Sequence, residues 1–368
     1  MRTAMADHEL AARRAPTRPP KSRAGAVLAC AAIAFAVQWS CRPSPGSGDA
    51  GASDCRAFEP RPIGPKTTAV PRAQRRGASW QSGRRFEHVL LVVLENQDYE
   101  AVLREPYFRS LARRGALFTH YDALFHPSYP NYLALIGGRY FGTTGDEPLD
   151  IRGSARTIAD LLEAKGLTWR QYAEAYPGGC YRGEAASGPL YRRKHVPFLS
   201  FDSVAKRPSR CASIVPALAF DRRDLPNFAF YSPDMCHDGH DVCGNAYDRV
   251  KSAIRSVPGA RYFGVVPPKL AQSANWLEGF LEPILADDRV IRNTLVVVTF
   301  DESLSDDNNH IYTVFLGDMV RPGARVDGCY DHYDLLRTIE ENFGLGTLGA
   351  EDAKSDPIVE GVWQDARQ

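Results

Sequence analysis

The sequence predicts an α/β fold built on a mostly parallel β-sheet. Two apolar runs carry this prediction, residues 90–94 (LLVVL) and residues 294–300 (TLVVVTF). Continuous apolar runs of this length are typical of strands that are buried on both faces in the centre of a parallel sheet. Segments with helical hydrophobic spacing lie between the strand candidates, as the crossover connections of parallel strands require.

The other elements follow from the same patterns of apolar spacing. A short apolar run predicts a strand, and apolar residues repeating every three or four positions predict a helix. The region 178–223 is rich in Arg and aromatic residues without either period, so we expect an irregular insertion that caps the site. In chain order we expect a strand at Glu87–Leu94, helices at Pro106–Arg114 and Ala155–Lys165, the insertion at Gly178–Arg223, helices at Ala246–Arg255 and Trp276–Leu285, strands at Leu295–Phe300 and Ile311–Phe315, and a helix at Tyr333–Phe343.

Polar side chains stand directly after the two apolar runs. Glu95 and Asn96 follow the first, and Asp301 and Glu302 follow the second. Ligands of open α/β sheets bind outside the carboxyl ends of the strands, so we expect these four residues to converge. Carboxylate and amide oxygens suit a divalent metal ion and a phosphate-type substrate. The alternative, that they are ordinary turn residues, explains one such segment better than two with the same pattern.

A serine stands in a stiff segment between these runs. In the sequence HPSYPNYLALIGG, Pro127 and Pro130 keep the chain extended around Ser128, and a helix opens after Pro130. The unpaired N–H groups and the dipole of a helix N-terminus favour anions. A serine held there beside a metal ion can be deprotonated and attack phosphorus. The alternative is an ordinary residue near a helix cap.

Two further segments supply histidines. The segment 231–241 (YSPDMCHDGHD) follows an apolar strand candidate, and His310 begins the apolar segment HIYTVF. Imidazoles and carboxylates at this density suit metal binding or acid–base chemistry, although some of them must belong to a solvated loop. The residues of this type in the first segment are Asp234, His237, Asp238, His240 and Asp241.

In their order and spacing, these segments resemble the bacterial phosphoesterase family of acid phosphatases and phospholipases C. That family belongs to the alkaline phosphatase superfamily. The resemblance extends from Glu87 to Leu345 and also includes the segment YDHYDLLRTIEENFGL. It implies an alkaline-phosphatase-like, doubly wound α/β sheet with helices on both faces.

The resemblance also implies a mechanism. Glu95 and Asn96 fall on metal ligands, and Ser128 falls on a nucleophile that contacts the metal and forms a phosphoseryl intermediate. Asp301 and Glu302 fall on the acidic pair that completes the metal site. The acid phosphatases have two aspartates there, so Glu302 departs from their pattern.

The histidines would contact phosphate or protonate the leaving group, with His240 and His310 ahead of His237. One divalent ion is expected. Carboxylate, amide and hydroxyl ligands do not distinguish Mg, Ca, Mn, Fe and Zn. Such a site predicts an acidic-to-neutral pH optimum.

The N-terminus predicts export. Five basic residues within positions 13–23 precede the apolar stretch Ala24–Trp39, which is the layout of a signal peptide. Cys41 and the Pro/Gly/Ser-rich sequence after it resemble a lipoprotein leader with a lipidated cysteine. A plain signal peptide and an uncleaved membrane anchor remain alternatives. We therefore expect a periplasmic, envelope-attached or secreted protein. The expected organisation is a leader at 1–41, a disordered tether at 42–86, a phosphoesterase domain at 87–350 and a C-terminal tail at 351–368.

Cysteine usage agrees with export. Besides Cys30 and Cys41, six cysteines remain, and an even number in an oxidising compartment predicts disulfides. We expect Cys236–Cys243 to close a short loop, Cys180–Cys211 to tie the insertion together, and Cys55–Cys329 to form by elimination. A thiolate zinc site is the alternative, but the sequence contains no CxxC spacing.

Together these features predict an exported, metal-dependent phosphoesterase. Phosphomonoesters are the first expected substrates and phospholipid head-group diesters the second. The net charge of +1 predicts neither a nucleic acid nor an anionic membrane as a partner. A sulfatase-like hydrolase would require a CxPxR context that is absent. A degenerate surface lipoprotein is the remaining alternative, and convergence of the five predicted metal-site residues would argue against it.

Overall fold

An eight-stranded sheet organises the part of the chain that the computed structural model describes, namely residues 80, 83–186, 190–243, 268–304 and 309–364. The predicted leader, most of the tether including Cys55, and the predicted helix Ala246–Arg255 lie outside these residues. The strand order is β4-β3-β5-β1-β6-β7-β2-β8. The strands are β1 His88–Leu94, β2 Ala116–Asp122, β3 Trp169–Ala173, β4 Ile214–Pro216, β5 Phe228–Ser232, β6 Thr294–Phe300, β7 Thr313–Leu316 and β8 Ala324–Asp331.

Most neighbouring strands run parallel. β1 lies between β5 and β6 and is parallel to both, and β3 pairs in parallel with β4 and β5. β7 is antiparallel to β6 and β2, and β2 is parallel to β8. The sheet is therefore mixed but mostly parallel, and the predicted fold class is confirmed.

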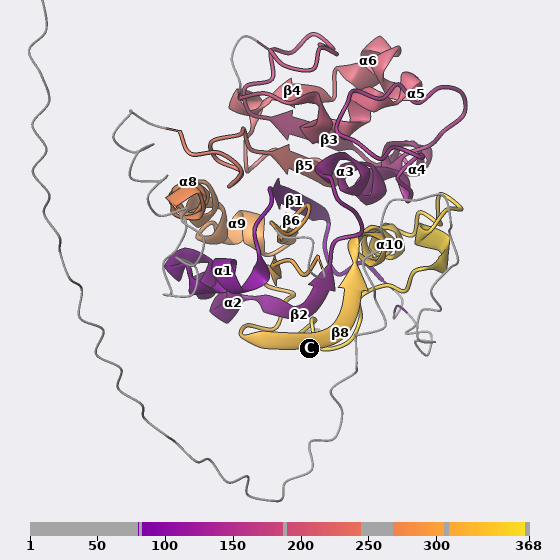
Figure 1. Cartoon of the computed structure of the whole chain (residues 1–368). Coiled ribbons are helices and arrows are strands. Elements are labelled where there is room, and N and C mark those ends of the chain that lie inside the picture. Colours follow the sequence, from indigo (N-terminus) through magenta and orange to yellow (C-terminus); the bar gives the residue numbers. More distant parts are fainter. Residues whose placement is uncertain (1–79, 81–82, 187–189, 244–267, 305–308, 365–368) are drawn as a thin grey trace, which may run out of the picture. The chain divides into compact units, whose positions relative to one another are not determined.

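Helices cover both faces of the sheet (Figure 1). α3, α4 and α10 lie on one face, and α1, α2, α8 and α9 lie on the other. This arrangement is the one expected when right-handed crossovers place helices on alternate faces of a parallel sheet. The helices are α1 Tyr99–Arg104, α2 Pro106–Arg114, α3 Ser128–Gly137, α4 Ile158–Ala164, α5 Asp202–Ala205, α6 Pro208–Cys211, α8 Pro268–Leu285, α9 Asp288–Ile291 and α10 His332–Phe343.

Capping side chains set helix boundaries that apolar spacing did not predict. α4 begins at Ile158 rather than Ala155, because the Thr157 hydroxyl accepts the Ala159 N–H at 3.2 Å. The Asp160 carboxylate accepts the Thr157 N–H at 2.9 Å and completes a capping box. α10 likewise begins at His332, after the Asp331 cap. α8, Pro268–Leu285, includes eight residues before the predicted start at Trp276.

The insertion between β3 and β5 is more ordered than predicted. Its segment Ile214–Pro216 forms β4, which extends the sheet beyond β3. The Cys180–Cys211 disulfide ties the insertion together, as predicted. The insertion was predicted to be irregular, and these short elements were not predicted because they are stabilised by tertiary contacts, which local patterns do not encode. Its other short elements are the 3-10 turns η2 Arg193–His195, η3 Pro197–Ser200 and η4 Ala217–Ala219, with α5 and α6.

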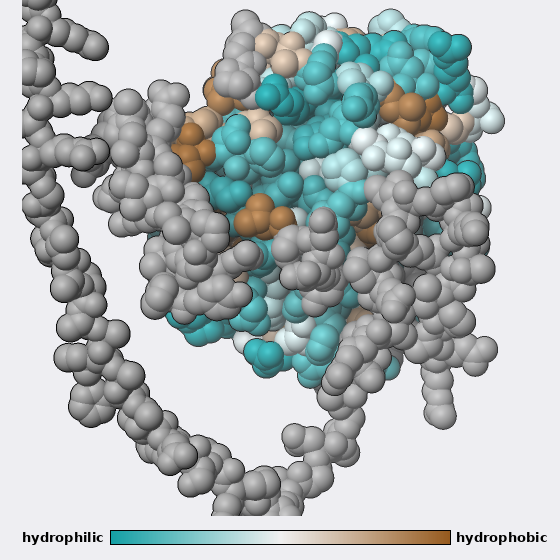
Figure 2. Space-filling view, in the orientation of Figure 1, coloured by the Kyte–Doolittle hydropathy of each residue, from teal (hydrophilic) through white to brown (hydrophobic). Residues whose placement is uncertain are grey.

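The central strands form the core. Val89–Leu94 of β1 and most of β6 are fully buried, as the apolar runs predicted. The core continues past the predicted domain end, since Ile358, Val362 and Trp363 are also buried. The face of the molecule in Figure 2 is mostly hydrophilic between small hydrophobic patches. Within the described ranges, no helix has both the length and the apolar character needed to cross a bilayer.

Candidate active site

Two adjacent strands deliver the acidic residues to one point. Leu94 of β1 lies opposite Phe300 of β6, so Glu95 and Asp301 leave the sheet side by side. The Asp301 N–H donates to the Leu94 carbonyl at 2.9 Å. Asn96 takes a left-handed conformation with φ 43°, which Asn tolerates better than most residues, and its N–H donates to Asp301 Oδ1 at 3.2 Å. The turn after β1 is thereby fixed to the end of β6.

Ser128 reaches this point from α3. The helix begins at Ser128 itself, three residues before the predicted opening after Pro130. Pro130 fits the first turn because its missing N–H would have no partner within the helix. The Ser128 hydroxyl donates to Glu302 Oε1 at 2.9 Å and lies 3.4 Å from Asn96 Oδ1. The structure thus brings Ser128 together with residues from both strand ends, while the roles assigned to them stay predictions.

His126 is a neighbour that the sequence interpretation did not single out. Its Nδ1 forms a close contact with Glu302 Oε2, the carboxylate oxygen that Ser128 does not use. Glu302 therefore lies between an imidazole and the candidate nucleophile. The position of His126, two residues before Ser128, was the available signal.

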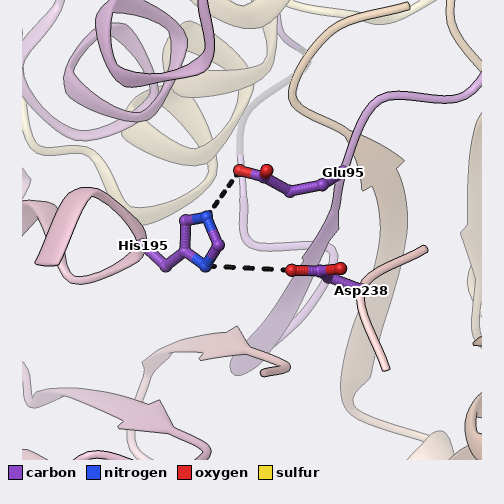
Figure 3. A group of neighbouring side chains, drawn as sticks. All are labelled: Glu95, His195 and Asp238. Carbon is purple, nitrogen blue, oxygen red and sulfur yellow. Dashed lines mark ion pairs between the residues drawn. The ribbon is translucent and has the colours of Figure 1, made fainter. Parts of the chain in front are cut away.

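Lys194 and His195 were also missed, because they lie in the insertion. His195 Nε2 lies 2.7 Å from Glu95 Oε1, and Lys194 Nζ lies 3.4 Å from Glu95 Oε2. Figure 3 shows the His195 imidazole between the carboxylates of Glu95 and Asp238, with Nδ1 3.9 Å from Asp238 Oδ2. The only sequence signal was a basic cluster, RRKH, of a kind that is usually solvated.

The loop after β5 places Asp238. The Asp238 carbonyl accepts the Glu95 N–H at 2.8 Å, and the Gly239 carbonyl accepts from the Gln97 amide at 2.8 Å. Gly239 has φ 99°, and a Cβ there would lie 3.3 Å from the Glu95 carbonyl. A side chain at this position would be strained, so glycine permits the close approach.

Four carboxylates are buried together: Glu95, Asp238, Asp301 and Glu302 have exposed fractions of 2% or less. Burial, followed by the charge of Glu95, raises the pKa values of Asp238 and Asp301 well above their usual range. Burial alone would also raise the pKa of Glu95, but His195 and Lys194 lower it below its usual value. Buried carboxylates of this number require compensating positive charge.

The residues present fit a divalent metal ion. The buried oxygens Asp301 Oδ2 and Asp238 Oδ2 accept no hydrogen bond from the described part of the chain. Glu95, His195 and Asp238 offer ligand atoms within 4.8 Å of one another. Asn96, Ser128, Asp301 and Glu302, which are connected by hydrogen bonds, add further ligand oxygens. Hard oxygen donors with one imidazole suit several divalent ions.

His240 is the predicted catalytic histidine that lies nearest this cluster in the interactions described. Its backbone N–H donates to Asp238 Oδ1 at 2.7 Å, and its ring Nδ1 lies 2.9 Å from Asp241 Oδ1. Its charge also contributes to lowering the pKa of Glu95. The catalytic role of His240 stays a prediction.

His237 and His310 lie in other surroundings. His237 Nδ1 lies 2.6 Å from Glu174 Oε2, and its ring stacks on Trp276 with centroids 5.4 Å apart. His310 stacks on Tyr99 at 4.0 Å, and burial together with the charge of His120 lowers its pKa to about 4. These contacts explain both residues structurally, and their predicted catalytic roles remain to be tested.

The Cys236–Cys243 disulfide closes the loop that carries Asp238 and His240, as predicted. Cys55 lies outside the described residues, so the predicted Cys55–Cys329 pair is not described.

Replacing Cys236 and Cys243 together by Ala should lower the free energy of unfolding by about 2–3 kcal/mol, the chain-entropy estimate for a loop of this length. The turnover number should fall about tenfold or more, since a displaced Asp238 or His240 costs rate steeply. Thermal unfolding and kcat measured well below the melting temperature check this. Unchanged values of both would show that the bridge does not order the loop.

Comparison with known proteins identifies the class first. The structure resembles a solved protein of the alkaline phosphatase superfamily from Vibrio parahaemolyticus, with a TM-score of 0.50, 14% identity, and coverage of 77% of this chain and 72% of that chain. At this identity the similarity concerns the fold, which is of the alkaline phosphatase type.

The sequence identifies the family. The model of the Phosphoesterase family matches residues 101–257 and 267–346. A probable acid phosphatase from Kluyveromyces lactis is 31% identical over 289 residues, 75% of this chain and 62% of that protein. A phosphatidylinositol-3-phosphatase from Mycobacterium tuberculosis is 32% identical over 287 residues, 76% of this chain and 84% of that protein. The chain belongs to the phosphoesterase family, and spans 57% to 65% of the fungal relatives' lengths.

Proposed function

We propose that the protein is an exported, metal-dependent phosphoesterase that hydrolyses phosphate monoesters through a phosphoseryl intermediate. The observation that carries this proposal is the meeting of a helix-borne serine with a buried carboxylate cluster. Ser128 Oγ lies 2.9 Å from Glu302, beside Asp301 and Glu95. Membership of the phosphoesterase family supports the same reaction class.

The residues of this chain divide the reaction between them. Ser128 Oγ attacks phosphorus while its proton passes to Glu302, which accepts the hydroxyl hydrogen bond at 2.9 Å. A Ser128 O–P bond forms, and the ester P–O bond to the leaving alcohol breaks. The N-terminus of α3, at which Ser128 stands, favours the negative charge of the phosphate. Glu302 holds the Ser128 hydroxyl in place and is itself held by His126. A bound divalent ion would supply charge neutralisation and make the serine hydroxyl more acidic.

Protonation of the leaving group falls to His240 in this proposal. It stands on the disulfide-closed loop next to Asp238. In the second half of the reaction, water attacks the phosphoserine, its P–O bond to Ser128 breaks, and inorganic phosphate leaves with the serine restored. A histidine serves both halves, as acid and then as base.

The names of the relatives suggest two kinds of substrate. Several fungal relatives are named acid phosphatases, and the mycobacterial one is named a phosphatidylinositol-3-phosphatase. Small soluble phosphomonoesters are therefore the first candidates, and phosphorylated lipid head groups are the second. The alternative reaction is the phospholipase C-type cleavage of lipid diesters. The substrate screen below distinguishes it from hydrolysis of either kind of monoester.

Export is part of the proposal. It is supported by the signal-like sequence of residues 13–39 and by two disulfides, Cys180–Cys211 and Cys236–Cys243, which persist in oxidising compartments. Whether Cys41 carries a lipid can be read from the mass of the mature N-terminus.

The purified full chain should hydrolyse p-nitrophenyl phosphate, and a chelator should abolish the activity until a divalent ion is restored. The screen includes phosphatidylinositol 3-phosphate in vesicles and the diester bis-p-nitrophenyl phosphate. Release of inorganic phosphate from monoesters alone supports the proposal. Faster cleavage of the diester would favour the phospholipase C alternative, and no hydrolysis of any ester would overturn the proposal.

A further inference from the structure

A short chain of charged contacts connects the candidate nucleophile to Glu95 from outside the predicted metal site. Asp146 Oδ1 accepts the N–H of Tyr129, the residue after Ser128, at 3.0 Å. Asp146 Oδ2 accepts from Lys194 Nζ at 3.0 Å. Lys194 Nζ in turn lies 3.4 Å from Glu95 Oε2.

We propose that Lys194, held by Asp146, is a positioning residue that orients Glu95 and supplies a fixed positive charge beside the candidate metal site. The inference rests on the proposed function, because it assigns a role within that site. The inference goes beyond the proposed function because it names a cationic side chain in the insertion. The charge of Lys194 would lower the affinity of the carboxylate cluster for a divalent ion.

Burial distinguishes this lysine from a surface ion pair. The Lys194 side chain is 8% exposed and the Glu95 side chain is fully buried. An exposed pair such as Lys206–Asp202, 2.8 Å apart on α5 and the residue after it, is 62% exposed at the lysine. Lysines are rarely buried unless they are paired, so the position of Lys194 requires both of its carboxylates.

The insertion is built to hold this lysine. Arg193, next to it in η2, forms a close contact with Asp150 and donates to the Leu149 carbonyl at 3.1 Å. Two successive basic residues, Arg193 and Lys194, therefore form ion pairs with the 146–150 loop. The same loop accepts the hydrogen bond from the Tyr129 N–H. A shift of Lys194 would be transmitted to Ser128 through Asp146.

The charge of Lys194 predicts effects on ion binding and turnover that differ in sign. Lys194→Met removes a positive charge near Glu95, so the ion-free site becomes more negative and should bind Mn²⁺ about threefold to tenfold more tightly. The same change releases Glu95 from one fixed partner, the Lys194 ammonium 3.4 Å away. The value of kcat at saturating Mn²⁺ should fall about tenfold or more.

Asp146→Asn provides the complementary change. The amide oxygen can still accept the Tyr129 N–H, but the negative charge that balances Lys194 is lost. Lys194 then faces Glu95 with its charge uncompensated, and Mn²⁺ affinity should fall about twofold to fivefold. Asp146 is 40% exposed at its side chain, so this variant tests the idea even if Lys194→Met does not fold.

The experiment titrates chelator-treated protein with Mn²⁺ by calorimetry and measures kcat and KM on p-nitrophenyl phosphate. Lys206→Met is the matched control and should change neither quantity. Tighter Mn²⁺ binding with lower kcat in Lys194→Met, and weaker binding in Asp146→Asn, support the proposal. Parallel losses of affinity and turnover in Lys194→Met, or wild-type values in both variants, overturn it. A wild-type protein without activity or Mn²⁺ binding would instead overturn the proposed function.

Discussion

Ser128→Ala should abolish phosphate ester hydrolysis while the fold is retained. The Ser128 hydroxyl contacts Glu302 at 2.9 Å and Asn96 at 3.4 Å, and the alanine variant removes that group from the end of α3. Loss of a covalent nucleophile costs several orders of magnitude, so kcat should fall by a factor of about 10³ or more. Stability should change by less than about 1 kcal/mol, because alanine is a better helix former than serine.

The measurement is steady-state hydrolysis of p-nitrophenyl phosphate, with thermal unfolding of each variant as a check on folding. Ser203→Ala is the matched control, since Ser203 stands on α5 and its hydroxyl bonds only weakly to the Ala155 carbonyl at 3.4 Å. Brief reaction of the wild type followed by acid quenching and mass spectrometry should reveal phosphate on Ser128. Near-full turnover in the alanine variant would mean that water attacks phosphorus directly.

The sequence predicted the part of the site that parallel-sheet topology fixes. Glu95 and Asp301 each follow a continuous apolar run, and two such runs in one sheet place their polar ends at the same edge. Ser128 could be predicted because prolines and a helix opening flank it. In each case the signal lies within a few residues of the candidate side chain.

The residues that were missed depend on contacts between distant segments. Lys194 and His195 meet Glu95 across about 100 positions of sequence, from an insertion that shows no helical or strand period. The local sequence RRKH does not indicate whether its lysine is buried or solvated, because the same neighbouring residues are compatible with either environment. His126 contacts Glu302 through a turn whose geometry the local pattern does not specify. Tertiary packing determines whether such residues contact the site.

The second large effect concerns Asp301. This carboxylate is fully buried: Oδ1 accepts the Asn96 N–H at 3.2 Å, whereas Oδ2 accepts no hydrogen bond within the described residues. Burial and the charges of Glu95 and Glu302 raise its pKa well above the usual value. A carboxylic acid with a raised pKa costs the folded state stability as the pH rises from its unfolded pKa through its folded pKa, and the cost is absent only below the unfolded pKa.

Asp301→Asn should therefore have opposite effects on stability and function. Asparagine keeps the shape and the Oδ1 acceptor but cannot ionise, so the ion-free variant should be more stable than the wild type at pH 7. Hydrolysis should fall by a factor of about 10² or more, because a charged oxygen donor to the ion is lost. Thermal unfolding with chelator and kinetics with Mn²⁺ measure the two effects.

Asp334→Asn is the control, because Asp334 is an equally buried aspartate and each of its carboxylate oxygens accepts a hydrogen bond. It accepts the N–H groups of Asp331 at 3.0 Å and Asp356 at 3.2 Å. Its replacement should lower stability and leave hydrolysis within about twofold. Mn²⁺ should raise the melting temperature of the wild type and of Asp334→Asn, but much less that of Asp301→Asn, since a ligand stabilises only the state that binds it. If Asp301→Asn were destabilised without the ion and still gained the full Mn²⁺ shift, Asp301 would be a structural residue and the acidic end of β6 would not hold a metal.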